Sequence, residues 1–90
     1  MLDEIKKIQG INHTDFDNMI NTWINSAKLD LKGVGIVDTL IDAQTPDALI
    51  QTAIITYVLS FLDVSNAELY AQSYSLQKDV LRHSKEYMEG

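Results

Sequence analysis

The stretch IQTAIITYVLSFLDV, residues 50–64, is the most apolar part of this chain and decides its fold. Between Ala53 and Leu62 only Thr56 and Ser60 are fully polar, and no residue is charged. Such a run fits a membrane segment, a buried strand, a core helix or a surface that binds partners. The residues on either side of the run distinguish these possibilities.

The segment that contains this run begins with a helix start signal, Thr45-Pro46-Asp47. The signal supplies a capping residue, a proline at the first helical position and an acid in the first turn. From there to Leu62 the segment is about 17 residues long, which exceeds an average strand and falls short of the ~20 apolar residues that span a bilayer. Asp63 follows as the stop. We therefore predict a helix that is apolar nearly all round and enclosed on most sides.

A second long helix is predicted ahead of this one. Thr14 is a suitable N-cap, and Asp15 and Asp17 suit the positive end of the helix dipole. Gly33 and Gly35 stop the helix. Apolar residues recur along it at helical spacing and form one stripe: Phe16, Met19, Ile20, Trp23, Ile24, Ala27 and Leu31.

The last helix is predicted to restart at Ser65 and Glu68, which are spaced as a capping box. It carries two adjacent stripes. One consists of Leu69, Ser73, Leu76, Val80, His83 and Tyr87. The other consists of Tyr70, Tyr74, Gln77 and Leu81. Such a helix carries more apolar surface than one neighbouring helix can cover. The sequence does not determine which of the two stripes would face another subunit.

These segments together predict an all-α fold. We expect a small bundle of three main helices, a short leading helix over residues 2–9 that Gly10 ends, and one or two turns over residues 37–41, all in a single domain over residues 1–90. No cysteine is present, so disulfides and thiolate metal sites are excluded. The first ten residues lack the apolar run of a secretory signal, so we expect the protein to stay in the cytoplasm in which it is made.

The charge balance argues against direct binding of nucleic acid. Thirteen acidic residues face seven basic ones, for a net charge of −6, and Arg82 is the single arginine. Gripping a phosphate backbone requires several cations on one face, whereas each lysine here has acids nearby. The acidic residues are usually just a solvated surface, and we keep that interpretation unless the protein assembles with other chains.

No residues suggest catalysis, a cofactor or a metal ion. His13 lies beside Asp15 and Asp17, but the segment lacks the central glycine and closing glutamate of a calcium loop, and a capping cluster is the simpler interpretation. His83 and Glu86, three residues apart, would be a weak ligand pair. We therefore predict no enzyme activity, no cofactor and no metal site.

The sequence divides the apolar residues into core and interface candidates. The core candidates are Phe16, Ile20, Trp23, Ile24, Ala27, Leu31, Ile50, Ile54, Tyr57, Val58, Phe61, Leu76 and Val80. The candidates for contact with other subunits or partners are Leu59, Leu62, Leu69, Tyr70, Tyr74 and Tyr87. Aromatic residues are enriched at the centres of interfaces, which favours a partner surface for part of the tyrosine set.

Three segments together resemble the head–tail connector proteins of long-tailed bacteriophages, often labelled DNA-packaging proteins. They are WINSAKLDLKGVGI (23–36), IQTAIITYVLSF (50–61) and NAELYAQSYSLQKDVLRHSKEY (66–87). In the first, the matching residues are Trp23, Ile24, Ala27, Lys28, Asp30, Leu31, Gly35 and Ile36. In the second they are Ala53, Ile54, Thr56, Tyr57 and Val58. In the third they are Ala67, Glu68, Ser73, Tyr74, Leu76, His83, Ser84, Glu86 and Tyr87.

The chain departs from the family pattern in two places. Leu59 stands where a lysine is expected, and Leu69-Tyr70 replaces a basic–aromatic pair. Both departures make the surface of this chain more apolar and acidic. They therefore bear on its partner contacts and leave the expected fold unchanged.

The resemblance implies a non-enzymatic structural adaptor that forms a ring under the portal, joins head to tail and helps to retain packaged DNA. Its implied partners are the portal protein, a tail-side completion protein and copies of itself. The implied location is the head–tail junction of the virion after synthesis in the host cytoplasm, with DNA passing through the ring without sequence-specific binding and with no membrane contact. The alternative is a small acidic helical regulatory or protein-binding module, such as an antitoxin-like or helix-turn-helix partner protein.

Overall fold

The computed structural model describes residues 1–88, and its regular elements are helices, which confirms the all-α prediction. The three longest are α2 (Asp17–Gly33), α4 (Ala48–Leu62) and α5 (Ala67–Arg82). Shorter ones are α1 (Leu2–Gln9), α3 (Asp38–Ile41) and the 3-10 helix η1 (Val64–Asn66). In residues 1–88 the only extended pairing is an isolated antiparallel bridge between Ile36 and Met88.

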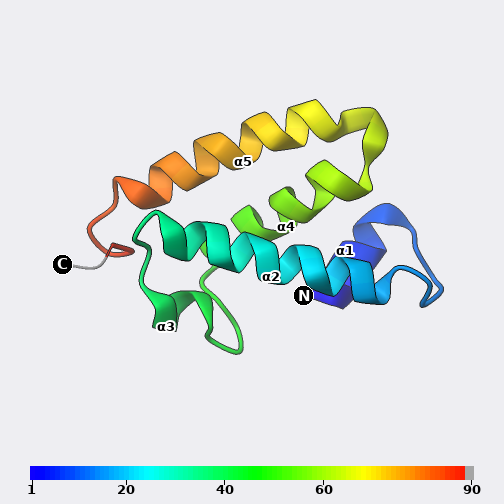
Figure 1. Cartoon of the computed structure of the whole chain (residues 1–90), viewed down its shortest axis with the longest axis horizontal. Coiled ribbons are helices and arrows are strands. Elements are labelled where there is room, and N and C mark those ends of the chain that lie inside the picture. The colour runs from blue at the N-terminus through cyan, green and yellow to red at the C-terminus, as the bar shows by residue number, and fades with distance from the viewer. Residues whose placement is uncertain (89–90) are drawn as a thin grey trace.

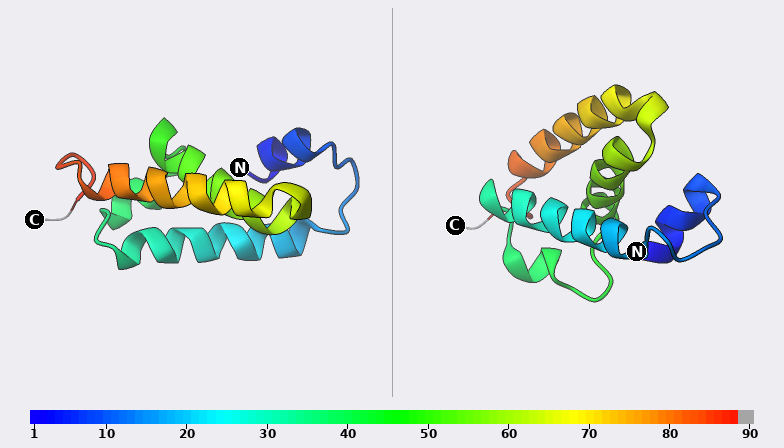
Figure 2. Two further views of the ribbon diagram at one scale, coloured as in Figure 1. Left: turned by 90° about the horizontal axis from the view of Figure 1, so that it is seen from above. Right: turned by 45° about the vertical axis from the view of Figure 1, so that its right-hand side comes forward.

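The apolar run over residues 50–64 forms most of α4, and this helix is the centre of the fold. It packs against both α5 and α2, and it passes between them in Figure 1 and in the right view of Figure 2. Its buried residues lie on several sides of the helix: Ile50, Ala53, Ile54, Thr56, Val58 and Leu59. The prediction of a helix enclosed on most sides is therefore confirmed.

Within residues 1–88 no single helix is long and apolar enough to cross a bilayer. The helix α4 and the segment Val64–Arg82 together reach the required length and composition, but the two are bent by 108° at the break between them. In this structure the run over residues 50–64 lies in the protein core, against α2 and α5.

The three predicted N-caps are not the ones that the structure uses. The cap of α4 is Asp47, whose Oδ1 accepts a hydrogen bond of 2.8 Å from the Leu49 N–H, so the helix begins two residues after the predicted proline position. The helix α2 begins at Asp17 instead of following Thr14, and its N-terminus has no side-chain cap. The predicted capping box at Ser65 is likewise absent, because that residue lies in η1.

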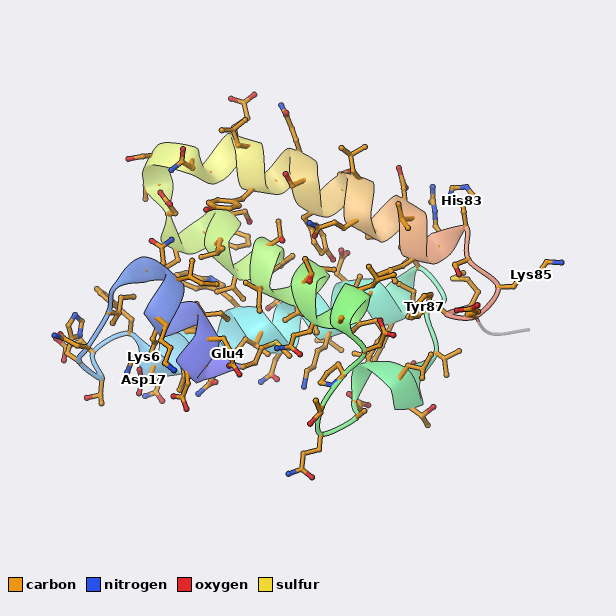
Figure 3. The ribbon with its side chains drawn as sticks, turned by 180° about the vertical axis from the view of Figure 1, so that it is seen from behind. Glu4, Lys6, Asp17, His83, Lys85 and Tyr87 are labelled. Carbon is orange, nitrogen blue, oxygen red and sulfur yellow. The ribbon has the colours of Figure 1, made fainter. Side chains whose placement is uncertain are left out.

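An ion pair lies at the start of α2, whose N-terminus has no side-chain cap. The Lys6 Nζ of α1 lies 2.8 Å from the Asp17 Oδ1, and Figure 3 shows the two side chains together where α1 meets α2. An acid in the first turn also suits the helix dipole. This pair connects the short leading helix to the bundle.

The segment after α5 folds back over the loop that follows α2. The helix ends at Arg82, and not near Tyr87 as the stripe suggested. The carbonyl of Tyr87 accepts a 2.8 Å hydrogen bond from the Val37 N–H, and its hydroxyl donates a 2.8 Å hydrogen bond to Asp47 at the start of α4. The C-terminal segment therefore joins the α2–α3 loop to the start of α4 (Figure 3).

The turn after α2 requires a glycine at position 35. Gly35 has a φ of +96°, a region that costs an L-residue about 1–2 kcal/mol. A Cβ there would lie 2.9 Å from the terminal methyl of Met88, which is the movable end of a flexible side chain. The backbone conformation, more than the available space, therefore selects glycine.

Gly35→Ala is expected to lower the free energy of unfolding by about 1 kcal/mol or more. The matched control is Gly33→Ala, because Gly33 is helical and nothing lies within 4 Å of the added Cβ. That change should stabilise the protein by up to about 1 kcal/mol. Thermal unfolding followed by circular dichroism measures both, and shifts of the same sign would contradict the assignment.

Most of the core candidates are buried, and four are not. Buried are Ile20, Ile24, Ala27, Leu31, Ile50, Ile54 and Val58, while Trp23 and Tyr57 are partly buried against the same cluster. The corrections are Phe16, Phe61, Leu76 and Val80, which are 48%, 49%, 68% and 60% exposed. Phe16 precedes the first residue of α2 and so leaves its buried stripe, and Phe61 lies in the last turn of α4. The other two lie on the outer side of α5.

Candidate interaction surfaces

The two stripes of α5 have opposite environments. The stripe of Tyr70, Tyr74, Gln77 and Leu81 faces the rest of the chain, with Leu81 only 1% exposed. The other stripe faces solvent, and Leu69 on it is 64% exposed. The packing of α4 against one side of α5 explains why Leu76 and Val80 are outside the core.

Three of the interface candidates are enclosed within the chain, so those predictions are wrong for the surface of a single copy. Leu59 is 4% exposed because α4 is covered on that side, and Tyr74 and Tyr87 are each 8% exposed because their hydroxyls hydrogen-bond to groups on other elements. Leu62 and Tyr70 are partly buried against the core, and Leu69 lies on the surface.

A polar contact joins α2 to α5 beside the core. The Tyr74 hydroxyl donates a 2.5 Å hydrogen bond to the Asp30 Oδ2, and the Lys78 Nζ lies 3.1 Å from the same oxygen and 5.2 Å from the centre of the Tyr74 ring. Burial favours a higher pKa for Asp30, but the hydrogen bonds from Tyr74 and Lys78 outweigh it and the pKa is lowered. Burial and the hydrogen bond to Asp30 raise the pKa of Tyr74. The contact is therefore strongest with a charged carboxylate and a neutral tyrosine.

A second carboxylate–tyrosine contact fixes the C-terminal segment. The hydrogen bond from Tyr87 and the one from the Leu49 N–H both hold the pKa of Asp47 below its ordinary value. The hydrogen bond from the Tyr87 hydroxyl to Asp47 also raises the pKa of Tyr87. Asp30, Tyr74 and Tyr87 all belong to the segments that resemble the connector family, and here all three hold helices together.

Aromatic rings line the junction of α2, α4 and α5. Trp23 stacks on Phe61 with ring centres 5.7 Å apart, Tyr57 lies 5.2 Å from Phe61, and Tyr57 meets the edge of Tyr74 at 5.1 Å. Offset and edge-to-face pairs of this kind stabilise the packing beyond the area that they bury. Trp23 and Tyr57 therefore act in packing, with the edge of Phe61 left in solvent.

Two helix faces are exposed and free of charge. The first, called the α5 face, consists of Leu69, Gln72, Ser73, Leu76 and Val80. The second, called the α2 face, consists of Asn18, Met19, Thr22, Asn25 and Leu29. Met19 and Leu29 are 52% and 67% exposed, and no residue from 18 to 27 or from 69 to 77 is charged. Each face combines large apolar side chains with small or amide groups.

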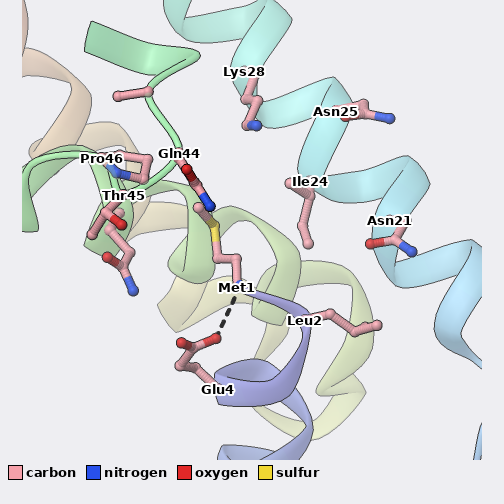
Figure 4. A pocket seen from close by; sticks show the side chains of 12 residues that line it. Met1, Leu2, Glu4, Asn21, Ile24, Asn25, Lys28, Gln44, Thr45 and Pro46 are labelled. Carbon is pink, nitrogen blue, oxygen red and sulfur yellow. Dashed lines mark ion pairs between the residues drawn. The ribbon is translucent and has the colours of Figure 1, made fainter.

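The surface hollows formed by residues 1–88 include a small one and a larger one. The small one, of about 120 Å³, is lined by Leu49, Thr52, Gln77, Val80 and Leu81 and adjoins the α5 face. The larger one, of about 400 Å³, has mostly polar lining and lies between α1, α2 and the loop before α4 (Figure 4). Asn21, Asn25 and Lys28 face it from α2, and its carboxylate Glu4 lies 3.0 Å from the Met1 amino group. The larger hollow offers amide groups for hydrogen bonds beside the charged groups of Glu4, Lys28 and the Met1 amino terminus.

The two histidines make only local contacts. His13 Nδ1 accepts a 3.3 Å hydrogen bond from the Asp15 N–H, and His83 Nδ1 lies 2.8 Å from the Asp79 carbonyl at the end of α5. Among residues 1–88 no group of three histidine, aspartate or glutamate side chains is placed to hold a metal ion. The predicted capping cluster at His13 does not form either, because α2 starts further along.

Sequence reasoning missed part of the exposed apolar surface. Leu29 was on neither list, and Met19 was placed on the inward stripe of its helix, although both are exposed. Leu49 and Val64, at 50% and 83% exposed, were also overlooked. The signal available in the sequence was the absence of charge from residues 18–27 and 69–77, which a search for apolar spacing alone does not register.

The chain is an all-helical protein whose outer helices present uncharged faces and whose signature residues fasten α2, α4 and α5 together. A family model described as phage connector protein matches residues 1–87, which covers every helix of the structure. The chain therefore belongs to the phage connector proteins. Searches among curated proteins and among solved structures found no match.

Proposed function

We propose that this chain is a non-enzymatic structural adaptor, a single domain over residues 1–90 that forms a ring beneath the portal, joins head to tail and helps to retain packaged DNA. The match to the phage connector family over residues 1–87 carries this proposal. The expected partners are the portal protein, a tail-side completion protein and other copies of the chain. We expect the protein to act at the head–tail junction of the virion, after its synthesis in the host cytoplasm.

The exposed apolar surface supports a role in assembly. Among residues 1–88, ten large hydrophobic side chains are about half exposed or more: Ile8, Phe16, Met19, Leu29, Leu49, Phe61, Val64, Leu69, Leu76 and Val80. Scattered apolar residues are ordinary on a protein surface, whereas aligned ones on charge-free faces indicate contact with other chains. The family match and this surface point to the same role.

The acidic surface suits a conduit for DNA. A basic lumen would hold the duplex through its phosphates, whereas a negative one lets it slide. Asp15 and Asp42, 82% and 53% exposed, are among the acids available to line such a channel. Neutralising the acids that face the lumen should leave the ring intact and change the retention or ejection of DNA, and unchanged retention and ejection would contradict this hypothesis.

Electron microscopy of the purified protein mixed with the portal protein of its own phage tests the proposed function. We expect extra ring density stacked coaxially on the portal, which also gives the copy number. If the portal is well assembled and the protein does not associate with it at high concentration, the adaptor role is wrong. A small helical binding module would then be the better description.

A further inference from the structure

We infer that neighbouring subunits of the ring meet head to tail, with the α5 face of one copy packed against the α2 face of the next. This inference rests on the proposed function, because it assigns the contact by which that ring closes. The two faces lie on separate helices that flank α4, each on the solvent side of its helix. A repeated contact between two different faces closes into a ring when the rotation permits.

The charge pattern identifies a second copy of this chain as the occupant. Thirteen acids give each copy a net charge of −6, so two copies repel wherever carboxylates meet. A basic partner would favour acidic contact faces, whereas a partner as acidic as this chain excludes them and is compatible with neutral ones. The five residues of each face are uncharged, and the carboxylates nearest to them, Asp17, Glu68 and Asp79, lie at the edges. Asp17 and Asp79 are already paired with Lys6 and Arg82, so a contact centred on the two faces leaves their ion pairs in place.

The two faces match in length. The helices α2 and α5 contain 17 and 16 residues. The five residues of the α2 face extend from Asn18 to Leu29 and those of the α5 face from Leu69 to Val80, a rise of roughly 16 Å in each case at 1.5 Å per residue. Two faces of equal length on helices of equal length suit packing of one helix along the other.

The available area also suits this contact. A standard interface buries about 800 Å² on each partner, so a subunit with two such interfaces gives up roughly 1,600 Å². The chain exposes 5615 Å² in total, so this is less than a third of its surface. The α5 face extends across the 120 Å³ hollow to Leu49 of α4, which is 50% exposed and widens the apolar contact.

One group that lines the hollow beside the α5 face has an unpaired polar atom. The Oε1 of Gln77 is buried and has no hydrogen-bond partner within residues 1–88. The α2 face carries the side-chain amides of Asn18 and Asn25, which are donors, beside the apolar Leu29. The α2 face therefore offers an apolar side chain to the apolar lining of the hollow and, once the Gln77 side chain turns outward, an amide donor to its Oε1.

Glutamate substitutions at one exposed leucine of each face test the inference. Leu76→Glu blocks the α5 face and Leu29→Glu the α2 face, and both residues are exposed, so each variant should fold as the parent does. Ile8→Glu is the matched control, because Ile8 of α1 is 54% exposed and belongs to neither face. Sedimentation velocity over a concentration series measures self-association, with circular dichroism to check folding. We expect each face variant to need at least about tenfold more protein for the same degree of association, and the control to behave as the parent.

Mixing the two face variants tests the head-to-tail arrangement. The Leu76→Glu protein keeps an intact α2 face and the Leu29→Glu protein an intact α5 face, so the mixture should form one-to-one dimers and nothing larger. Self-association of Leu29→Glu at the parent level would show that the α5 face pairs with itself or with another partner. That result, or unchanged association of both variants, overturns the inference, as does a parent protein that does not associate alone or on the portal.

The portal experiment distinguishes a failure of the proposed adaptor function from a wrong assignment of the two faces. If coaxial ring density forms with the parent, the control and both face variants alike, the adaptor function stands and the assignment of the faces is wrong. If no density forms with any of them, the proposed function itself fails. Ring density that is lost only with the face variants, while single copies still bind the portal, supports both.

Discussion

Leu81→Ala is expected to lower the free energy of unfolding by about 3 kcal/mol, whereas Leu76→Ala should change it by less than about 0.5 kcal/mol. The two leucines lie on the same helix, five residues apart, and differ in environment, being 1% and 68% exposed. Truncating the buried one removes apolar contacts and leaves a cavity against the core. Truncating the exposed one removes few contacts, because the chain itself covers little of the Leu76 side chain.

Urea unfolding followed by circular dichroism, at a protein concentration low enough to keep the chain monomeric, measures this difference. At about 4–8 °C per kcal/mol for a domain of this size, the Leu81 variant should also melt well over 10 °C below the parent. Equal effects of the two substitutions would show that the Leu76 stripe is in the core. The assignment of the α5 face as a contact surface would then be wrong as well.

The sequence was sufficient to predict the helices and most of the core. Helical spacing along residues 16–31 is long and regular, so it predicted the buried residues Ile20, Ile24, Ala27 and Leu31. The length and start signal of the segment around residues 50–62 outweighed its β-branched residues. Gly10 ends α1 with a φ of +67°, as its place after the apolar turn suggested.

The orientation of α5 could not be predicted from the sequence. Its two stripes carry comparable apolar content, so spacing alone does not select the one that faces α4. Two contacts made at long range decide it. The hydroxyl of Tyr74 reaches Asp30, 44 residues earlier, and Leu81 enters the core. Partners that distant in sequence leave no local pattern.

The first residues of the helices could not be predicted from the sequence either, because several residues near each start are suitable N-caps. Thr45 and Asp47 are both acceptable N-caps, and the tertiary hydrogen bond from Tyr87 to Asp47 favours the latter. Similarly, Thr14 was a suitable cap for α2, yet the ion pair of Asp17 with Lys6 lies at the observed start. Interactions between elements resolved choices that local propensity left equal.

Asp30→Ala is expected to destabilise the protein by about 2 kcal/mol, because it leaves the buried Tyr74 hydroxyl without its acceptor and Lys78 without its ion-pair partner. The matched control is Asp79→Ala, whose exposed ion pair with Arg82 should contribute less than about 0.5 kcal/mol. In a double-mutant cycle, the variant that carries both Asp30→Ala and Tyr74→Phe should be destabilised by less than the sum of the two single changes. Strict additivity would show that the two side chains do not interact in solution.

The same contact predicts a dependence on pH with a definite sign. The pKa of Asp30 is lower in the folded protein than its ordinary value of 3.8, so its stabilisation is complete above about pH 4 and is lost as the pH falls through the folded value. The pKa of Tyr74 is raised above 10.0, so its contribution is complete below about pH 10 and is lost at higher pH. Unfolding measured from pH 2 to pH 11 should therefore show a smaller acid loss for Asp30→Ala and a smaller alkaline loss for Tyr74→Phe than for the parent. Parallel curves for all three proteins would mean that Asp30 and Tyr74 are not paired, and α5 would then need another anchor to keep its apolar face outward.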